Sequence, residues 1–194
     1  MNNGYVNELL KARGNLQLFR SVIHRIAGFL SLKYVEEYHC SDKTVLMTVL
    51  RAGIALERSF LKRIFPAPQL HYIRTKRDPE TLKAKVLDKT FGENCEKADT
   101  DAVLILEPML ATGGTMEVVI NEINKAFKPE QVFIISVFVS KITEETIGDK
   151  ATIIALSKGH DLNDRGYILI TDPYNTGEIV TLDLGDEYCG TNSH

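Results

Sequence analysis

Hydrophobic positions in residues 6–37 recur at the three- and four-residue spacing of an amphipathic helix. Gly14 and Asn15 interrupt this spacing, and such a pair is typical of a break between two helices. The pattern therefore predicts a short first helix and a longer second one within an N-terminal helical segment, residues 1–40. The positions that define the apolar face are Leu9, Leu10, Leu16, Phe19, Ile23, Ile26, Ala27 and Leu30.

After residue 40, apolar runs rich in branched residues alternate with segments of helical spacing. Strands that alternate with helices form a mostly parallel sheet with helices on both faces. The predicted fold class is therefore α/β, with about five strands in the central sheet. The predicted strands are 44–50, 70–73, 103–106, 131–139 and 151–156, and the predicted helices are 54–65, 116–127 and 142–148.

Size and composition favour one domain over residues 1–194, because 194 residues that are 44% hydrophobic can bury a substantial core. A net charge of −3 without a broad basic region disfavours a primary role in binding nucleic acid or membranes. No apolar run approaches the roughly 20 residues that span a bilayer, and residues 1–5 do not begin a signal peptide. Cys40, Cys95 and Cys189 follow no metal-ligand spacing, so we expect free thiols, a cytoplasmic location and no metal site built from protein ligands.

The turn between the predicted strand at 103–106 and the following helix carries the clearest chemistry. Gly113 and Gly114 let backbone N–H groups converge, and the hydroxyls of Thr112 and Thr115 flank them. Together with the positive end of the helix dipole, these donors would hold a dianionic phosphate. Glu107 at the end of the strand is suited to accept hydrogen bonds from two sugar hydroxyls. Phosphate beside diol indicates a ribose 5-phosphate; the alternative is a glycine turn that merely ends the strand.

This stretch resembles the phosphoribosyl-pyrophosphate (PRPP) motif of the uracil phosphoribosyltransferase family, which reads Asp-Pro-Met-Leu-Ala-Thr-Gly-Gly-Ser. Here Glu replaces the Asp and Thr replaces the Ser, and both changes are chemically mild. The resemblance implies a type I phosphoribosyltransferase fold, and PRPP bound together with Mg²⁺ that is held mainly by PRPP itself. It also implies a PRPP-binding stretch made of Glu107, Pro108, Met109, Leu110, Ala111, Thr112, Gly113, Gly114 and Thr115.

Two arginines are expected to bind the pyrophosphate group. Leu50-Arg51-Ala52-Gly53 matches the pyrophosphate loop of the family, and a guanidinium such as that of Arg51 can pair two phosphate oxygens at once. Residues 74–98 form a polar excursion that resembles the family's flexible arm, where Arg77 takes the place of the arginine that reaches pyrophosphate. Arg74 and Lys76 are possible helpers, and an ordinary solvated charge run is the alternative for this segment.

The C-terminal segment, residues 157–194, takes the place of the family's hood, which binds the base. Tyr167 and Ile168 match the family's Leu-Asn-x-x-Gly-Tyr-Ile, but the glycine-rich Pro-Gly-Leu-Gly-Asp-Ala-Gly-Asp that should follow is absent. An ungapped alignment gives Tyr174 the position of the hood aspartate. A gapped alignment gives the Gly-Asp-Ala positions to Gly185, Asp186 and Glu187, and the sequence leaves both alignments open.

The resemblance implies an enzyme that transfers ribose 5-phosphate from PRPP to a nucleobase, with uracil favoured, to give UMP and pyrophosphate. Arg51, Arg77 and Glu107 are the expected catalytic residues, and a homo-oligomer, a dimer or tetramer, is expected because the family forms them. Two alternatives stay open because the hood differs: a non-catalytic regulator that binds PRPP or nucleotide, and a transferase for another base.

Overall fold

The computed structural model describes residues 3–78, 84–92, 100–172, 177 and 179–190. Its central sheet has the strand order β3-β2-β1-β4-β6-β5, and β7 also pairs with β6. All pairings are parallel except the antiparallel pair β2–β3. The strands are β1 (Thr44–Leu50), β2 (Gln69–Arg77), β3 (Ala84–Lys89), β4 (Ala102–Leu106), β5 (Met109–Leu110), β6 (Gln131–Ser140) and β7 (Thr152–His160).

This architecture confirms the predicted α/β fold with a mostly parallel sheet. The five predicted strands correspond to β1, β2, β4, β6 and β7. The described part of the sheet has seven strands rather than about five, because β3 adds an antiparallel edge and the two-residue β5 pairs with the end of β6. Strand β7 also runs on to His160, beyond the apolar run that predicted it.

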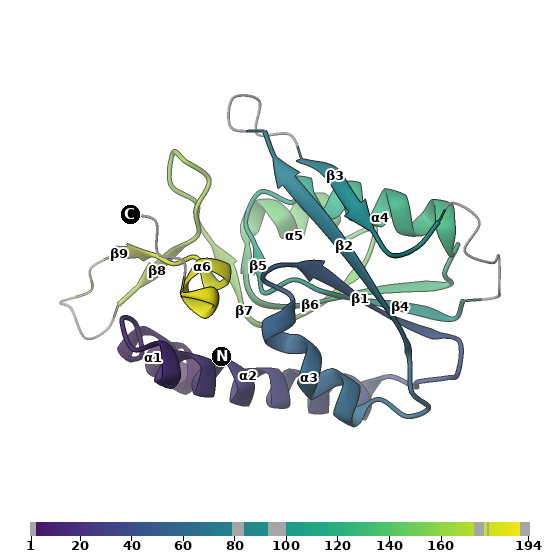
Figure 1. Ribbon diagram of the computed structural model, residues 1–194. Helices are drawn as coiled ribbons and strands as arrows, with labels where there is room; N and C mark the ends of the chain where they lie inside the picture. The colour runs from purple at the N-terminus through teal and green to yellow at the C-terminus, as the bar shows by residue number, and fades with distance from the viewer. Residues whose placement is uncertain (1–2, 79–83, 93–99, 173–176, 178, 191–194) are drawn as a thin grey trace.

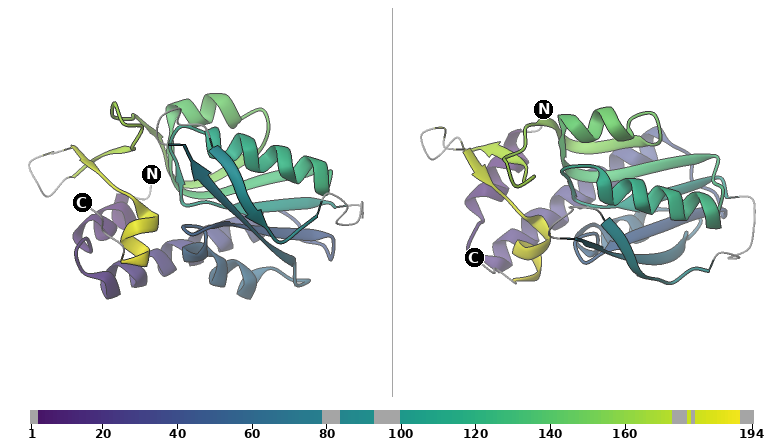
Figure 2. Two further views of the ribbon diagram at one scale, coloured as in Figure 1. Left: turned by 45° about the horizontal axis from the view of Figure 1, so that its top comes forward. Right: turned by 90° about the horizontal axis from the view of Figure 1, so that it is seen from above.

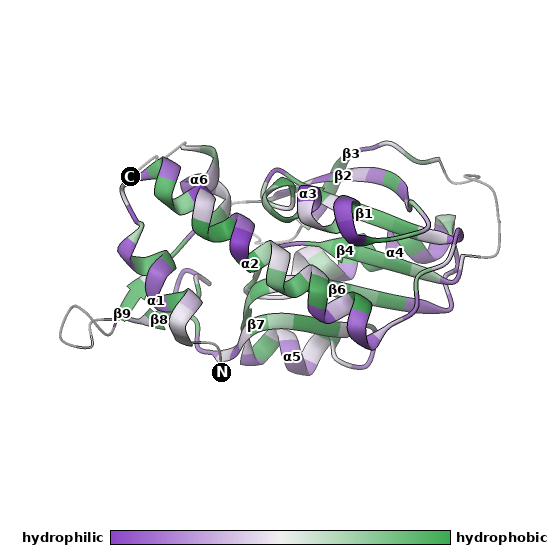
Figure 3. Ribbon diagram, turned by 90° about the horizontal axis from the view of Figure 1, so that it is seen from below, coloured by the Kyte–Doolittle hydropathy of each residue, from purple (hydrophilic) through white to green (hydrophobic). Residues whose placement is uncertain are grey.

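Helices cover both faces of the sheet (Figure 1). Helices α2 and α3 lie on one face over one hydrophobic core, while α4 and α5 lie on the other face over a second core. Figure 3 shows that the strands are mostly hydrophobic, whereas hydrophobic and hydrophilic residues alternate along the helices. The helices are α1 (Asn3–Lys11), α2 (Leu16–Glu37), α3 (Ile54–Arg63), α4 (Gly114–Ala126), α5 (Lys141–Ile147) and α6 (Leu184–Cys189).

The N-terminal segment forms two helices with a break at the expected place. Gly14 has a left-handed backbone conformation (φ 77°), and the Asn15 side chain caps α2 by accepting a hydrogen bond from the Leu18 N–H at 3.0 Å. One face of α2 is buried from Phe19 to Tyr34. None of the described helices is long and apolar enough to cross a membrane.

The expected arm, residues 74–98, begins as a β-ribbon. Strand β2 continues through it to Arg77, whose backbone pairs with Ala84 of β3. Residues 79–83 and 93–99 lie outside the described residues. The described part of the arm therefore extends the edge of the sheet, and polar composition concealed this because an edge strand can expose much of its surface.

The hood lies beside the sheet, next to α1 and the adjoining part of α2 (Figures 1 and 2). Strands β8 (Leu169–Thr171) and β9 (Ile179–Thr181) pair antiparallel, and α6 packs against α2. The Arg20 Nε donates to the Tyr188 carbonyl at 2.9 Å, and the His24 ring lies 3.0 Å from the Tyr188 hydroxyl. Helix α2 therefore connects the hood to the back of the sheet.

Candidate active site

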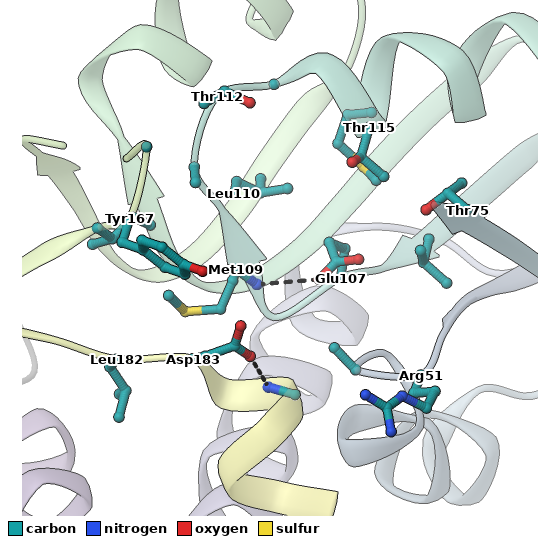
Figure 4. A pocket seen from close by; sticks show the side chains of 18 of the residues that line it. Arg51, Thr75, Glu107, Met109, Leu110, Thr112, Thr115, Tyr167, Leu182 and Asp183 are labelled. Atoms are coloured by element: carbon teal, nitrogen blue, oxygen red, sulfur yellow. Dashed lines mark hydrogen bonds between the residues drawn. The ribbon is translucent and has the colours of Figure 1, made fainter. Parts of the chain in front are cut away.

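A cavity of about 470 Å³ opens at the carboxyl ends of β1 and β4 (Figure 4). Residues from four segments line it, 49–52, 107–116, 165–168 and 182–185, together with Thr75 of β2. Ligands of open parallel sheets bind beyond the carboxyl ends of the strands. The cavity therefore brings together the phosphate-binding turn and the arginine turn, which the sequence predicted separately.

The phosphate loop, residues 111–115, joins β5 to the start of α4. Gly113 adopts a left-handed conformation (φ 78°), and a Cβ there would lie 2.9 Å from the Thr146 Oγ1. The backbone N–H groups at the start of a helix have no intrahelical partners, so those at the start of the 13-residue α4 are available to an anion. Thr112, Gly113 and Thr115 all line the cavity. Glycine at 113 therefore permits both the turn and the close packing behind it.

Two buried hydroxyl groups support this loop from behind. The Thr143 Oγ1 donates a hydrogen bond to the Ala111 carbonyl at 2.8 Å, and the Ser140 Oγ also donates to this carbonyl. Ser140 in turn caps α5 by accepting from the Thr143 N–H at 3.1 Å. The loop is thus fixed by groups 25 or more residues away, which no local sequence pattern indicated.

Arg51 lies in the tight turn between β1 and α3. Its guanidinium lines the cavity and forms an ion pair with Asp186 of α6, with an Nη2–Oδ1 distance of 3.2 Å. The Arg51 side chain is 59% exposed. Gly53, at the end of the same turn, packs against the ends of both strands, because a Cβ there would lie 2.3 Å from the Leu106 carbonyl oxygen. This close approach holds the Arg51 turn beside Glu107.

Glu107 follows β4 and faces the cavity from its floor (Figure 4). Burial is the main cause that raises the pKa of its carboxyl to about 8; the Met109 N–H opposes this rise, and the nearby charge of Asp183 adds a smaller contribution to it. That N–H lies 3.5 Å from the Glu107 Oε1. Because the pKa lies near neutral pH, a modest change in surroundings on ligand binding is enough to ionise the group.

Replacing Glu107 with glutamine should flatten the pH dependence of stability. The pKa of Glu107 rises from 4.5 to about 8 on folding, so between these values the folded chain binds a proton that the unfolded chain has released. Stability of the wild type should therefore fall as pH rises through this window, by up to about 1.4 kcal/mol per pH unit. Urea unfolding at pH 5.5, 6.5 and 7.5 measures this slope. Glu145→Gln, on the exposed surface of α5, should retain the wild-type slope; equal slopes for Glu107→Gln and the wild type would contradict the assignment.

The other residues of the expected PRPP-binding stretch take several positions. Met109, Leu110 and Ala111 line the cavity, and Gly114 is the first residue of α4. Pro108 is buried, and its carbonyl accepts hydrogen bonds from two N–H groups of β6. The backbone of Arg77 ends β2, and its side chain lies outside what the structure describes.

The hood residues expected to bind the base divide into three groups. Tyr167, Ile168 and Gly185 line the cavity. Asp186 contacts Arg51, and Glu187 lies away from the cavity wall, 3.5 Å from the Arg13 Nε. Tyr174 lies outside the described residues. The positions of Gly185 and Asp186 favour the gapped alignment.

Several cavity residues were missed by the sequence reasoning: Thr75, Arg165, Leu182 and Asp183. Asp183 immediately precedes Leu184-Gly185-Asp186, the part of the hood motif that recurs late in the chain. Extension of that motif by one residue towards the N-terminus would have identified it. Arg165 lies within the stretch that matches Leu-Asn-x-x-Gly-Tyr-Ile, at a position that the motif leaves open, and Thr75 carried no comparable signal.

Within the described ranges, no cluster of three His, Cys, Asp or Glu side chains is placed to hold a metal ion. Magnesium usually keeps several waters and binds through one or two carboxylates plus substrate phosphates. Glu107, a carboxylate on the cavity wall, fits such an ion, since metal binding favours the ionised form of its ligands. The donor set therefore suits magnesium that enters with its substrate. Of the three cysteines, Cys40 and Cys189 are free, while Cys95 lies outside the described residues.

The family model described as uracil phosphoribosyltransferase matches residues 17–172. The chain belongs to the uracil phosphoribosyltransferase family. A uracil phosphoribosyltransferase of Ureaplasma parvum serovar 3 is 30% identical over 141 residues, which cover 71% of this chain and 65% of that protein. One from Fervidobacterium nodosum is 34% identical over 143 residues, 71% of this chain and 66% of that protein. The match thus spans slightly less than two thirds of the Ureaplasma protein.

Solved structures share the fold of this family member. The AQ2163 protein of Aquifex aeolicus aligns with a TM-score of 0.80 at 22% identity, over 100% of this chain and 98% of that one. A hypoxanthine phosphoribosyltransferase from Staphylococcus aureus aligns with a TM-score of 0.56 at 16% identity, over 90% and 91% of the two chains. The family match ends at residue 172, so the α6 part of the hood lies beyond it.

Proposed function

We propose that this protein transfers ribose 5-phosphate from PRPP to a nucleobase, uracil, and releases UMP and pyrophosphate. The observation that supports this best is the single cavity of about 470 Å³ that unites the phosphate loop, Glu107 and Arg51. A nucleotide pocket needs mostly preformed walls and a few well-placed polar groups. Here those groups are the hydrogen-bond donors of the phosphate loop, the Glu107 carboxylate and Arg51 at the rim.

The reaction separates charge, and the residues of the cavity match that separation. As the bond to pyrophosphate opens, the ribose becomes cation-like and the leaving group gains negative charge. Arg51 would stabilise the leaving pyrophosphate, while the phosphate loop anchors the 5-phosphate. Glu107 would hold the ribose hydroxyls, and with a pKa of about 8 it can lose its proton when positive charge develops beside it. Magnesium bound with PRPP would supply further charge neutralisation at the pyrophosphate.

A second candidate is a regulator that binds PRPP or nucleotide without turnover. Two observations favour it: the family match stops before α6, and Asp186 pairs with the arginine that the leaving group needs. A third candidate is a transferase that uses the same phosphate side with a different base.

Pyrophosphate release from PRPP and Mg²⁺ with a panel of nucleobases should separate these candidates. We expect release that depends on uracil, with UMP as the product. Glu107→Gln, which keeps the shape of the side chain, should lower this rate and so exclude a contaminating enzyme as its source. PRPP binding without release for any base would establish the regulator, and release with another base alone would reject the uracil assignment. The cytoplasmic location and the homo-oligomer stay predictions.

A further inference from the structure

Part of the cavity wall is built by the hood. Leu182, Asp183 and Gly185 form one side of it, and Tyr167 and Ile168 form the other. Most of these groups are apolar or present only backbone to the cavity, which suits the flat faces of a nucleobase. Arg165 and Asp183 are the charged hood residues that line the cavity, and Figure 4 shows the Asp183 carboxylate directed towards Met109 and Glu107.

The orientation of Asp183 is fixed by its role as the N-cap of α6. Its Oδ1 accepts hydrogen bonds from the Gly185 N–H at 2.9 Å and from the Asp186 N–H at 3.0 Å. Both cap bonds end on the same oxygen, so Oδ2 is not needed for the cap. The cap therefore holds a carboxylate oxygen at the cavity in a defined direction.

Close packing of the following residues restricts movement of the Asp183 carboxylate away from the cavity. Gly185 is packed closely, since a Cβ there would lie 3.1 Å from the Cβ of Ala52 in the Arg51 turn. Leu184, the first residue of α6, is buried in the core beneath the hood. The packing of Gly185 and Leu184 therefore fixes the backbone that carries Asp183 beside the Arg51 turn.

We propose that Asp183 is a specificity-determining residue that reads the edge of the base by accepting a hydrogen bond from a ring N–H. This inference rests on the proposed function and extends it to the recognition of the base. In the gapped alignment, Asp183 occupies the position of a glycine in the family's hood motif, so this chain has a carboxylate where that motif has none. An ionised carboxylate only accepts hydrogen bonds. It therefore selects a base with a hydrogen-bond donor at this edge.

Uracil and cytosine differ at the relevant ring nitrogen. Uracil carries an N–H donor at N3, whereas cytosine has a lone pair there. A carboxylate that faces the cytosine lone pair leaves two acceptors opposed and unsatisfied, which disfavours binding. Asp183 therefore favours uracil over cytosine, in addition to any contact from the backbone.

Asp183→Asn tests this reading because asparagine caps helices about as well as aspartate. The two N–H groups of the cap would hold the amide oxygen, so the NH₂ group would face the cavity and replace an acceptor with a donor. The preference for uracil over cytosine in kcat/KM should fall by at least about 30-fold, because the donor now faces the uracil N–H and matches the cytosine lone pair. The Kd of UMP relative to that of CMP should shift in the same direction. The KM for PRPP should change less than about threefold.

Asp161→Asn is the matched control, since Asp161 is a 70% exposed aspartate that pairs with Lys141 outside the cavity. It should leave the uracil preference unchanged. An unaltered preference in Asp183→Asn, with unfolding like that of the wild type, would overturn the role of Asp183 while the transferase function stands. A shift in relative UMP and CMP binding without any turnover would instead reject catalysis and keep the base-reading role. A wild type that binds neither nucleotide would overturn both.

Discussion

Replacing Arg51 with alanine should lower the rate of pyrophosphate release by about 10²–10³-fold, the range found when one preorganised charge-stabilising donor is removed. The guanidinium lies at the rim of the cavity, where the leaving group would gain negative charge. Because it acts mainly on the transition state, the loss should appear chiefly in kcat, and binding of the nucleotide product should weaken much less. Steady-state kinetics with PRPP and uracil, with calorimetry of UMP binding, measures both effects.

Arg58→Ala is the matched control for this change. Arg58 is an exposed arginine on α3, outside the cavity, so its loss should leave the rate near that of the wild type. Arg51→Lys should recover only part of the lost rate, because an ammonium cannot pair two phosphate oxygens as a guanidinium does. An unchanged rate in Arg51→Ala would remove Arg51 from the site.

Replacing Gly53 with alanine should lower the free energy of unfolding by more than about 3 kcal/mol, or prevent folding altogether. The added Cβ would lie 2.3 Å from the Leu106 carbonyl oxygen and 2.7 Å from the Val49 carbonyl oxygen. Both are backbone atoms at the ends of adjacent strands, so neither can move without separating the Arg51 turn from Glu107. Urea unfolding measures the stability, and any folded fraction should bind PRPP poorly.

Gly28→Ala provides the opposite expectation for the same chemical change. Gly28 lies within α2, and a Cβ there would meet nothing within 4 Å. Alanine should stabilise the helix by about 0.5–1 kcal/mol relative to glycine. If Gly53→Ala were as stable as the wild type, the close packing of the two strand ends described here would be wrong.

Local patterns predicted much of the fold and the phosphate side of the cavity. The helical spacing around the Gly14-Asn15 break predicted α1 and α2, and the branched run at 44–50 predicted β1 with the observed bounds. Both signals are short in sequence and depend on periodicity and turn residues alone. The phosphate loop was similarly local, since its glycines, threonines and following helix are consecutive.

The hood could not be predicted in the same way because its position depends on distant contacts. Asp183 reaches the cavity only because α6 packs against α2, where Tyr188 contacts Arg20 and His24 more than 160 residues earlier. The support of Ala111 by Thr143 is equally non-local. Composition alone also hid β3, because a strand at the edge of a sheet can carry many charged side chains.

Because the hood is attached to α2, the two parts of the cavity are supported by different parts of the structure. The part of the cavity proposed to bind phosphate belongs to the sheet, so its geometry is tied to the core of the molecule. The part proposed to face the base belongs to the hood, which packs against α2. If the proposed function holds, substitutions in the hood should change the preferred nucleobase while binding of the sugar phosphate persists. This separation is consistent with a PRPP motif that matches the family beside a hood that differs from it. The hood is therefore the part to change in a redesign of base selectivity.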